Sequence, residues 1–138
     1  MICPVQSIVV ATGGLAFMPN IPGVELPGVV TSDEALVLPE KPRRIIVVGG
    51  GYIAVEFAGF FHGYGSDTTL MFRADLPLRG FEGSCRQFLS DRLTANGIKV
   101  KSGLNPDEIK IGADGKTLVV HTKEGPVLEA DVVMFATG

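Results

Sequence analysis

The sequence predicts an α/β fold in which a parallel sheet with helices is followed by a three-stranded antiparallel meander. The β-branched, apolar run at residues 44–48 leads through a glycine-rich turn into a helical pattern at 52–63. Strand and helix patterns then alternate as far as residue 101, which is typical of parallel sheets. From residue 108 the runs become short and alternating, and turn dipeptides such as Asp114-Gly115 separate them. Such spacing indicates antiparallel strand pairs.

The first third of the chain predicts less regular structure. Ser7–Ala11 is mostly apolar and is expected to form a buried strand. Residues 15–30 are rich in proline and glycine and predict an extended connection with turns. Thr31 or Ser32 is expected to cap a short helix that reaches about Leu38. The other expected elements are strand 44–48, helix 52–63, strand 68–72, helix 82–95, strand 98–101, strands 108–111, 117–122 and 127–130, and a last buried strand at 132–136.

Composition narrows the classes of function. With 138 residues, of which 46% are apolar, the chain can form one domain with a real core. A net charge of -3 does not favour nucleic acid or an anionic membrane as a partner, and no apolar run approaches the roughly 18 residues of a membrane span. Cys3 and Cys85 form no metal-binding or redox spacing. So few cysteines fit a reducing compartment such as the cytoplasm, with a plastid as the alternative.

The turn after the strand at 44–48 carries a dinucleotide-binding pattern. Gly49, Gly51 and Ala54 form G-x-G-x-x-A between a strand and a helix, which is the context that gives this motif weight. Gly49 permits the tight turn, Gly51 lets the main chain approach a pyrophosphate, and Ala54 allows close packing of helix and strand. The start of the helix offers free N–H groups to the phosphates. The pattern predicts a Rossmann-like domain for FAD or NAD(P); the alternative is a packing turn of another α/β protein.

Two arginines indicate which coenzyme this turn would bind. About twenty residues after the glycines, an NAD site places an acid that bonds the ribose 2′-hydroxyl. This chain has Arg73 there, followed by Arg79. A phosphate monoester carries roughly -1.5 to -2 charges, and arginine binds it through paired hydrogen bonds. The pair therefore predicts NADPH, unless both are ordinary solvated side chains.

Two further residues project from one face of the first helical turns. Tyr52 and Glu56 are four positions apart, so they are neighbours on a helix. A carboxylate on an otherwise apolar helix is costly unless it is paired. Glu56 is therefore either partly exposed or paired with a residue outside this chain.

Several stretches of the sequence together resemble the glutathione reductase family of flavoprotein disulfide reductases. They are Ala11-Thr12-Gly13, Pro19-Asn20-Ile21-Pro22-Gly23, Thr31-Ser32-Asp33-Glu34-Ala35, the run from Gly49 to Ala58, the run from Phe72 to Phe81, and Phe135-Ala136-Thr137-Gly138. The resemblance covers essentially the whole chain. It implies an internal fragment of a longer enzyme, with residues 1–25 as the end of the FAD-binding domain and a connection. Residues 26–138 would be the NADPH-binding domain, returning to the FAD domain at its C-terminus.

The same resemblance implies a reaction and a set of roles. The complete enzymes are FAD-containing homodimers that take a hydride from NADPH and pass electrons through a disulfide to glutathione disulfide. The residue matching Tyr52 covers the flavin until nicotinamide displaces it, and the one matching Glu56 pairs with a lysine of the FAD domain. The implied NADPH contacts are Gly49, Gly51, Tyr52, Ile53, Glu56, Arg73 and Arg79, and the implied FAD edge is Thr12, Gly13, Thr137 and Gly138.

Three alternatives stay open on the sequence. Trypanothione reductase shares nearly the same signature, whereas dihydrolipoamide dehydrogenase fits less well because it carries an acid where Arg73 stands. A solitary NADPH-binding sensor or regulator belongs to a different class. The chain has no C-x-x-x-x-C pair, so we expect no catalytic residue within it, no metal, and no disulfide reduction by the chain alone.

Overall fold

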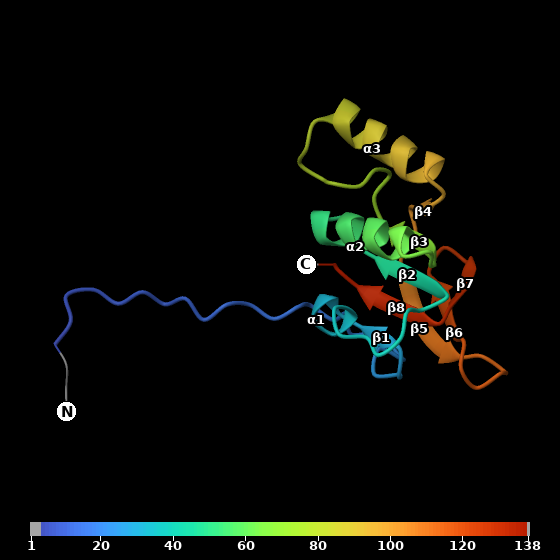
Figure 1. The fold of residues 1–138 in the computed structure, drawn as a ribbon, viewed down its shortest axis with the longest axis horizontal. Coiled ribbons are helices and arrows are strands. Elements are labelled where there is room, and N and C mark those ends of the chain that lie inside the picture. The colour runs from blue at the N-terminus through green and yellow to red at the C-terminus, as the bar shows by residue number, and fades with distance from the viewer. Residues whose placement is uncertain (1–3, 138) are drawn as a thin grey trace.

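The computed structural model describes residues 4–137 and confirms the predicted class of fold. A parallel sheet of five strands, in the order β1-β8-β2-β3-β4, forms the centre, with helices on one side and the antiparallel sheet β5-β6-β7 on the other (Figure 1). The elements are β1 Val29–Val30, α1 Ser32–Ala35, β2 Arg44–Val48, α2 Tyr52–Gly63, β3 Asp67–Phe72, α3 Gly83–Ala95, β4 Lys99–Ser102, β5 Pro106–Ile111, β6 Leu118–Thr122, β7 Val127–Ala130 and β8 Val132–Phe135.

The alternation of side chains along β2 builds two cores, one on each face of the parallel sheet. Ile45 and Val47 pack toward the helices, while Ile46 and Val48 pack toward the antiparallel sheet. All four are at most 3% exposed. A parallel strand covered on both faces reads as a continuous apolar run, which is why the sequence predicted this strand accurately.

Helix α2 lies close against the sheet because its inward residues are small. Ala54 and Ala58 are fully buried, and Phe61 near the end of the helix is 4% exposed. Gly65, with φ 83°, follows the helix and lets the chain turn back toward β3. A larger residue at Ala54 or Ala58 would push the helix away from the sheet, which we expect to cost about 1–3 kcal/mol.

A charged contact joins the parallel sheet to the antiparallel layer. The Arg44 guanidinium donates to Asp131 at 2.7 Å and to the Thr117 hydroxyl at 3.0 Å. The Arg44 backbone N–H also donates to the Asp131 carboxylate at 2.9 Å. These bonds hold the start of β2 beside the turn between β7 and β8, and so fix the register of the two central strands.

The structure corrects some expectations about the first third of the chain. No strand forms at Ser7–Ala11, and every residue from 4 to 17 is exposed in an extended segment that leads away from the folded body (Figure 1). Residues 15–30 contain a short strand that was not predicted, β1, which pairs with β8. Of the two predicted helix caps, Thr31 and Ser32, Thr31 is the N-cap residue. Helix α1 ends at Ala35 rather than near Leu38.

Neither a membrane-spanning helix nor a cluster of metal ligands occurs in the part of the chain that is described. Between residues 4 and 137, no helix is long and apolar enough to cross a membrane. The same residues contain no group of three or more His, Cys, Asp or Glu side chains arranged to hold a metal ion.

Glu82 caps helix α3 and gives a pH-dependent prediction. Hydrogen bonds from the Ser84 hydroxyl and from the backbone N–H groups of Ser84 and Cys85 lower the pKa of Glu82 from 4.5 to about 2. Because the folded-state pKa is depressed, the cap stabilises fully above pH 4.5 and is lost as the pH falls through about 2. Glu82→Gln should therefore lower the free energy of unfolding at pH 7, and this difference should shrink as the pH falls through about 2. An NMR titration of the Glu82 carboxyl checks this, and in Ser84→Ala its pKa should rise; an unchanged value there would contradict the cause.

Candidate functional site

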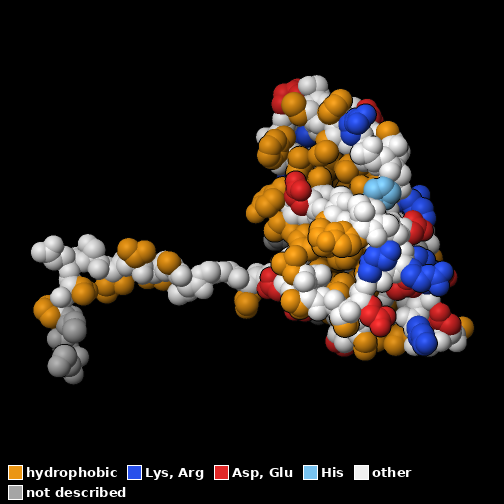
Figure 2. Space-filling view, viewed as in Figure 1, with side chains coloured by type: hydrophobic (Ala, Val, Ile, Leu, Met, Phe, Trp, Pro, Cys, Tyr) orange, Lys and Arg blue, Asp and Glu red, His pale blue; other side chains and the backbone are white. Residues whose placement is uncertain are grey.

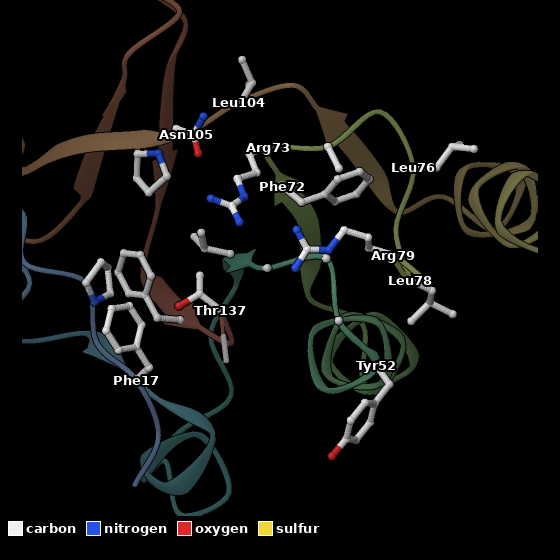
Figure 3. A pocket seen from close by; sticks show the side chains of 18 of the residues that line it. Phe17, Tyr52, Phe72, Arg73, Leu76, Leu78, Arg79, Leu104, Asn105 and Thr137 are labelled. Atoms are coloured by element: carbon white, nitrogen blue, oxygen red, sulfur yellow. The ribbon is translucent and has the colours of Figure 1, made fainter. Parts of the chain in front are cut away.

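A cleft of about 610 Å³ opens at the carboxyl ends of the parallel strands. The ends of β2, β3 and β8 and the segment after β4 all reach it (Figure 3). From β2 the chain proceeds to β3 on one side, and later returns as β8 on the other side. Ligands of open α/β sheets bind at such a switch point, outside the carboxyl ends of the strands. The topology thus places a binding site at the predicted glycine turn.

The glycine turn has the backbone that the sequence predicted. Gly49 has φ 147°, and a Cβ there would lie 2.3 Å from the Ala136 carbonyl oxygen and 3.2 Å from the Ala54 Cβ. Only glycine fits this position without displacing the main chain. A Cβ at Gly51 would meet no atom within 4 Å, so the protein itself does not demand glycine there. Open space over Gly51 is what close approach of a ligand to the main chain requires.

The start of α2 faces this open space with unpaired N–H groups. Gly51 is the N-cap residue, and no side chain of the described residues caps the helix. The first turn of α2 holds no acidic residue. The first N–H groups of a helix lack intrahelical partners, and the helix dipole adds positive potential at this end. The position suits an anion such as a pyrophosphate.

Arg73 and Arg79 lie together at the β3 side of the cleft. Both side chains are exposed and line the cleft, and their guanidinium groups extend into the same space (Figure 3). Within residues 4–137 neither guanidinium makes an ion pair, and none of the described lining residues is acidic. Two cations without counter-ions make this end of the cleft strongly attractive to a phosphate.

Lys123 and Asn105 also line this cleft, and sequence reasoning did not find them. Lys123 lines the same space and adds a third cation. Its backbone N–H donates to the Asn105 carbonyl at 3.0 Å, and Glu124 accepts from the Asn105 backbone N–H at 2.8 Å. These bonds bring the turn between β6 and β7 to the segment after β4. No local pattern signals this contact, because it joins residues about twenty positions apart through tertiary folding.

The other residues predicted on α2 lie at its first turns. Tyr52 is 69% exposed at the rim of the cleft, and its hydroxyl points away from the two arginines (Figure 3). Ile53 is half-buried and packs against the core on the helix side. Glu56 is exposed, and it forms no ion pair with any residue between 4 and 137. Both options that the sequence left open for Glu56 fit this position, because a partner outside the chain would leave the carboxylate equally exposed here.

The structure does not bring Thr12 and Gly13 to Thr137, the described residue at the other predicted FAD edge. Thr12 and Gly13 lie in the extended segment, away from the cleft (Figure 1). Thr137 lines the cleft beside the end of β8, while Gly138 lies outside the described residues.

Comparison with known proteins places this cleft in a family. A family model described as pyridine nucleotide-disulphide oxidoreductase matches residues 3–138. The chain belongs to this family. Its members use FAD and NAD(P)H, so the glycine turn and the arginines lie in a domain of the kind that binds these coenzymes.

Curated members of the family share much of this sequence. A trypanothione reductase of Trypanosoma congolense is 43% identical over 136 residues, covering 96% of this chain and 27% of that protein. A glutathione reductase of Burkholderia cepacia is 39% identical over 133 residues, covering 96% of this chain and 29% of that protein. The chain thus spans less than a third of the length of these relatives.

Solved structures of flavoprotein reductases and oxidases have the same fold. The HOCl-induced flavoprotein disulfide reductase RclA of Escherichia coli gives a TM-score of 0.83 at 30% identity, over 93% of this chain and 29% of that chain. An engineered water-forming NADPH oxidase bound to NADPH gives 0.81 at 25% identity, over 91% of this chain and 29% of that chain. It is a variant of the Lactobacillus brevis NADH oxidase. Its substitutions include two arginines six positions apart, an alanine for aspartate directly before the first arginine, and an alanine for glycine nineteen positions before it.

Proposed function

We propose that this chain is the NADPH-binding portion of a glutathione-disulfide reductase. The observation that carries this is the pair of guanidinium groups of Arg73 and Arg79 beside the glycine turn. Among residues 4–137 they have no ion-pair partner, and no acidic residue of that range lines the cleft. When bound, NADPH supplies a hydride for the flavin of the complete enzyme, whose overall reaction converts NADPH, a proton and glutathione disulfide into NADP⁺ and two glutathione molecules. The part played by the present residues is to bind and orient the coenzyme.

The residues of the cleft fit the two phosphate groups of NADPH. Gly49 shapes the turn, Gly51 leaves room for the main chain to approach a ligand, and the free N–H groups of α2 suit the pyrophosphate. Arg73 and Arg79 suit the 2′-phosphate that distinguishes NADPH from NADH. Ile53, in the first turn of α2, would also contact the coenzyme.

The engineered oxidase supports the choice of NADPH. Its two introduced arginines are six positions apart, and so are Arg73 and Arg79. Its introduced alanine lies nineteen positions before the first arginine, as Ala54 lies before Arg73. Where an aspartate was removed, directly before the first arginine, this chain has Phe72. The spacing of this chain is thus that of a protein redesigned from NADH to NADPH.

The proposed place of the chain in the complete protein explains its exposed apolar surface. Residues 1–25 would end the FAD-binding domain and connect it to the NADPH-binding domain at 26–138, with Thr12, Gly13 and Gly138 at the FAD. Apolar side chains are exposed along the extended segment and around α1 and α2 (Figure 2), among them Val9 at 86% and Val37 at 77%. The FAD domain would cover part of this surface.

Other features of the complete protein follow from the same proposal. Tyr52 would cover the flavin when nicotinamide is absent, and Glu56 would pair with a lysine of the FAD domain. The protein would be a homodimer in the cytoplasm, with glutathione disulfide as its substrate.

Trypanothione disulfide is the second candidate substrate. The trypanothione reductase of Trypanosoma congolense is 43% identical to this chain, against 39% for the Burkholderia cepacia glutathione reductase. The residues that choose between these disulfides are expected outside the NADPH-binding domain. Assaying the complete protein with both disulfides separates the two candidates.

Titrating the purified chain with NADPH and with NADH tests the proposal. Protein-induced changes in coenzyme fluorescence report binding. We expect weak but selective binding of NADPH, because the phosphate contacts are present and the FAD domain is not. We also expect no NADPH-dependent reduction of glutathione disulfide. Equal affinities for the two coenzymes would contradict the phosphate assignment, and measurable turnover would contradict the division of roles.

A further inference from the structure

Arg86 of helix α3 reaches back to the loop that carries Arg79. Its Nε donates to the Pro77 carbonyl at 2.6 Å and its Nη2 donates to the Leu76 carbonyl at 2.6 Å. Both bonds are partly buried, and Pro77 itself is fully buried. A single guanidinium therefore holds two successive carbonyl groups of the loop, through the rigid fork that arginine alone provides.

The residue after these carbonyls has an unfavourable backbone conformation. Leu78 has φ 54°, and it is the only non-glycine residue with positive φ among residues 4–137. Such a conformation persists only where surrounding contacts hold it. The Leu78 N–H in turn donates to the Gly50 carbonyl at 2.6 Å. The strained turn is thus held between Arg86 and the glycine turn.

Arg79 follows Leu78 directly, so this turn decides where its side chain starts. Within the described residues the Arg79 guanidinium forms no ion pair, and its position therefore depends on the backbone of the loop. The Leu78–Gly50 bond also ties Arg79 to the glycine turn, which would receive the pyrophosphate. The position of Arg79 relative to the glycine turn thus depends on this turn.

We propose that Arg86 is a positioning residue for coenzyme selection: it holds the strained Leu78 turn so that Arg79 is placed for the 2′-phosphate of NADPH. The inference rests on the proposed function, because it assumes that the cleft binds NADPH. Arg86 acts through the loop and touches no coenzyme atom. The rival explanation is that Arg86 contributes only its positive charge near the cleft.

The first set of variants separates geometry from charge. We expect Arg86→Gln to weaken NADPH binding about tenfold, roughly the value of one charge-assisted hydrogen bond, and to change NADH binding less than twofold. Arg86→Lys keeps the charge but cannot bind both carbonyls as a fork, so it should lose most of the same selectivity. Arg92→Gln, which removes an exposed arginine from the last turn of the same helix, is the matched control and should leave both affinities unchanged.

A second variant tests the strain itself. Glycine adopts positive φ readily, so with Leu78→Gly the turn should keep its conformation without the two hydrogen bonds from Arg86. In the Arg86→Gln background it should restore about threefold or more of the lost NADPH affinity. Hydrogen exchange at the residue 78 amide gives a reading that needs no coenzyme: it should quicken in Arg86→Gln and not in Arg92→Gln. Circular dichroism verifies that each variant is folded. If Arg86→Gln does not fold, the milder Arg86→Lys replaces it in these measurements.

The outcomes separate this inference from the proposed function. The wild type could prefer NADPH, and both Arg86→Gln and Arg86→Lys could keep that preference. This result would overturn the inference and leave the proposed function intact. Full selectivity in Arg86→Lys alone would also overturn it, in favour of charge. Absence of any preference in the wild type would overturn both.

Discussion

Replacing both Arg73 and Arg79 by glutamine should lower the affinity for NADPH several hundred-fold and leave the affinity for NADH within about twofold. Each guanidinium would lose a charge-assisted contact with the 2′-phosphate, worth roughly 1.5–3 kcal/mol. Discounted for the exposure of both side chains, the pair should contribute about 3–4 kcal/mol of discrimination, which corresponds to this factor. Fluorescence titration of the wild type and the variant with both coenzymes measures it.

Two controls make this result specific. Arg43→Gln removes an exposed arginine beside the opposite end of β2 and should leave both affinities unchanged. Arg73→Glu places an acid after β3, where an NAD site carries one, and should shift preference toward NADH. A parallel loss of NADPH and NADH affinity in the double variant would mean that the arginines serve another part of the coenzyme.

Gly49→Ala should unfold or severely destabilise the protein, at a cost of about 2–6 kcal/mol. The added Cβ would lie 2.3 Å from the Ala136 carbonyl oxygen, and alanine disfavours φ 147°. Backbone strain of roughly 1–3 kcal/mol adds to an overpacking cost of about 1–3 kcal/mol. Denaturant unfolding followed by circular dichroism measures the loss of stability.

Gly51→Ala is the matched variant, two positions along the same turn. A Cβ there meets nothing within 4 Å, so we expect a change in stability of at most about 1 kcal/mol, the usual range for an N-cap position. The methyl group would enter the space proposed for the pyrophosphate, and NADPH binding should weaken about tenfold or more. Unchanged binding would show that the main chain at Gly51 does not approach the ligand.

Local sequence patterns predicted the centre of the fold and the two sides of the cleft. The β-branched run of β2 is buried on both faces, and the glycines after it are typical of a tight turn before a helix, so strand, turn and helix were all recognisable. Arg73 was identifiable because it directly follows β3, and strands of a parallel sheet end at a common edge. These features depend on residues that are close together in the sequence.

Features that depend on distant partners were not predictable in this way. Ser7–Ala11 has the composition of a strand, but a strand needs a neighbour to accept its hydrogen bonds, and the described residues provide none. Conversely, β1 has only two residues and no recognisable pattern, yet it forms because Val29 and Val30 pair with β8. Arg86 binds backbone carbonyl groups of the loop before Arg79, and Lys123 is held at the cleft by its bond to the Asn105 carbonyl. Such carbonyl groups leave no signal in a sequence.

The structure of the chain in complex with NADP⁺ tests the central claim most directly. The account predicts that oxygens of the 2′-phosphate lie within about 2.7–3.2 Å of the guanidinium nitrogens of both Arg73 and Arg79, with the pyrophosphate over Gly51. A complex in which both guanidinium groups extend into solvent, with the adenosine ribose bound elsewhere, would contradict it.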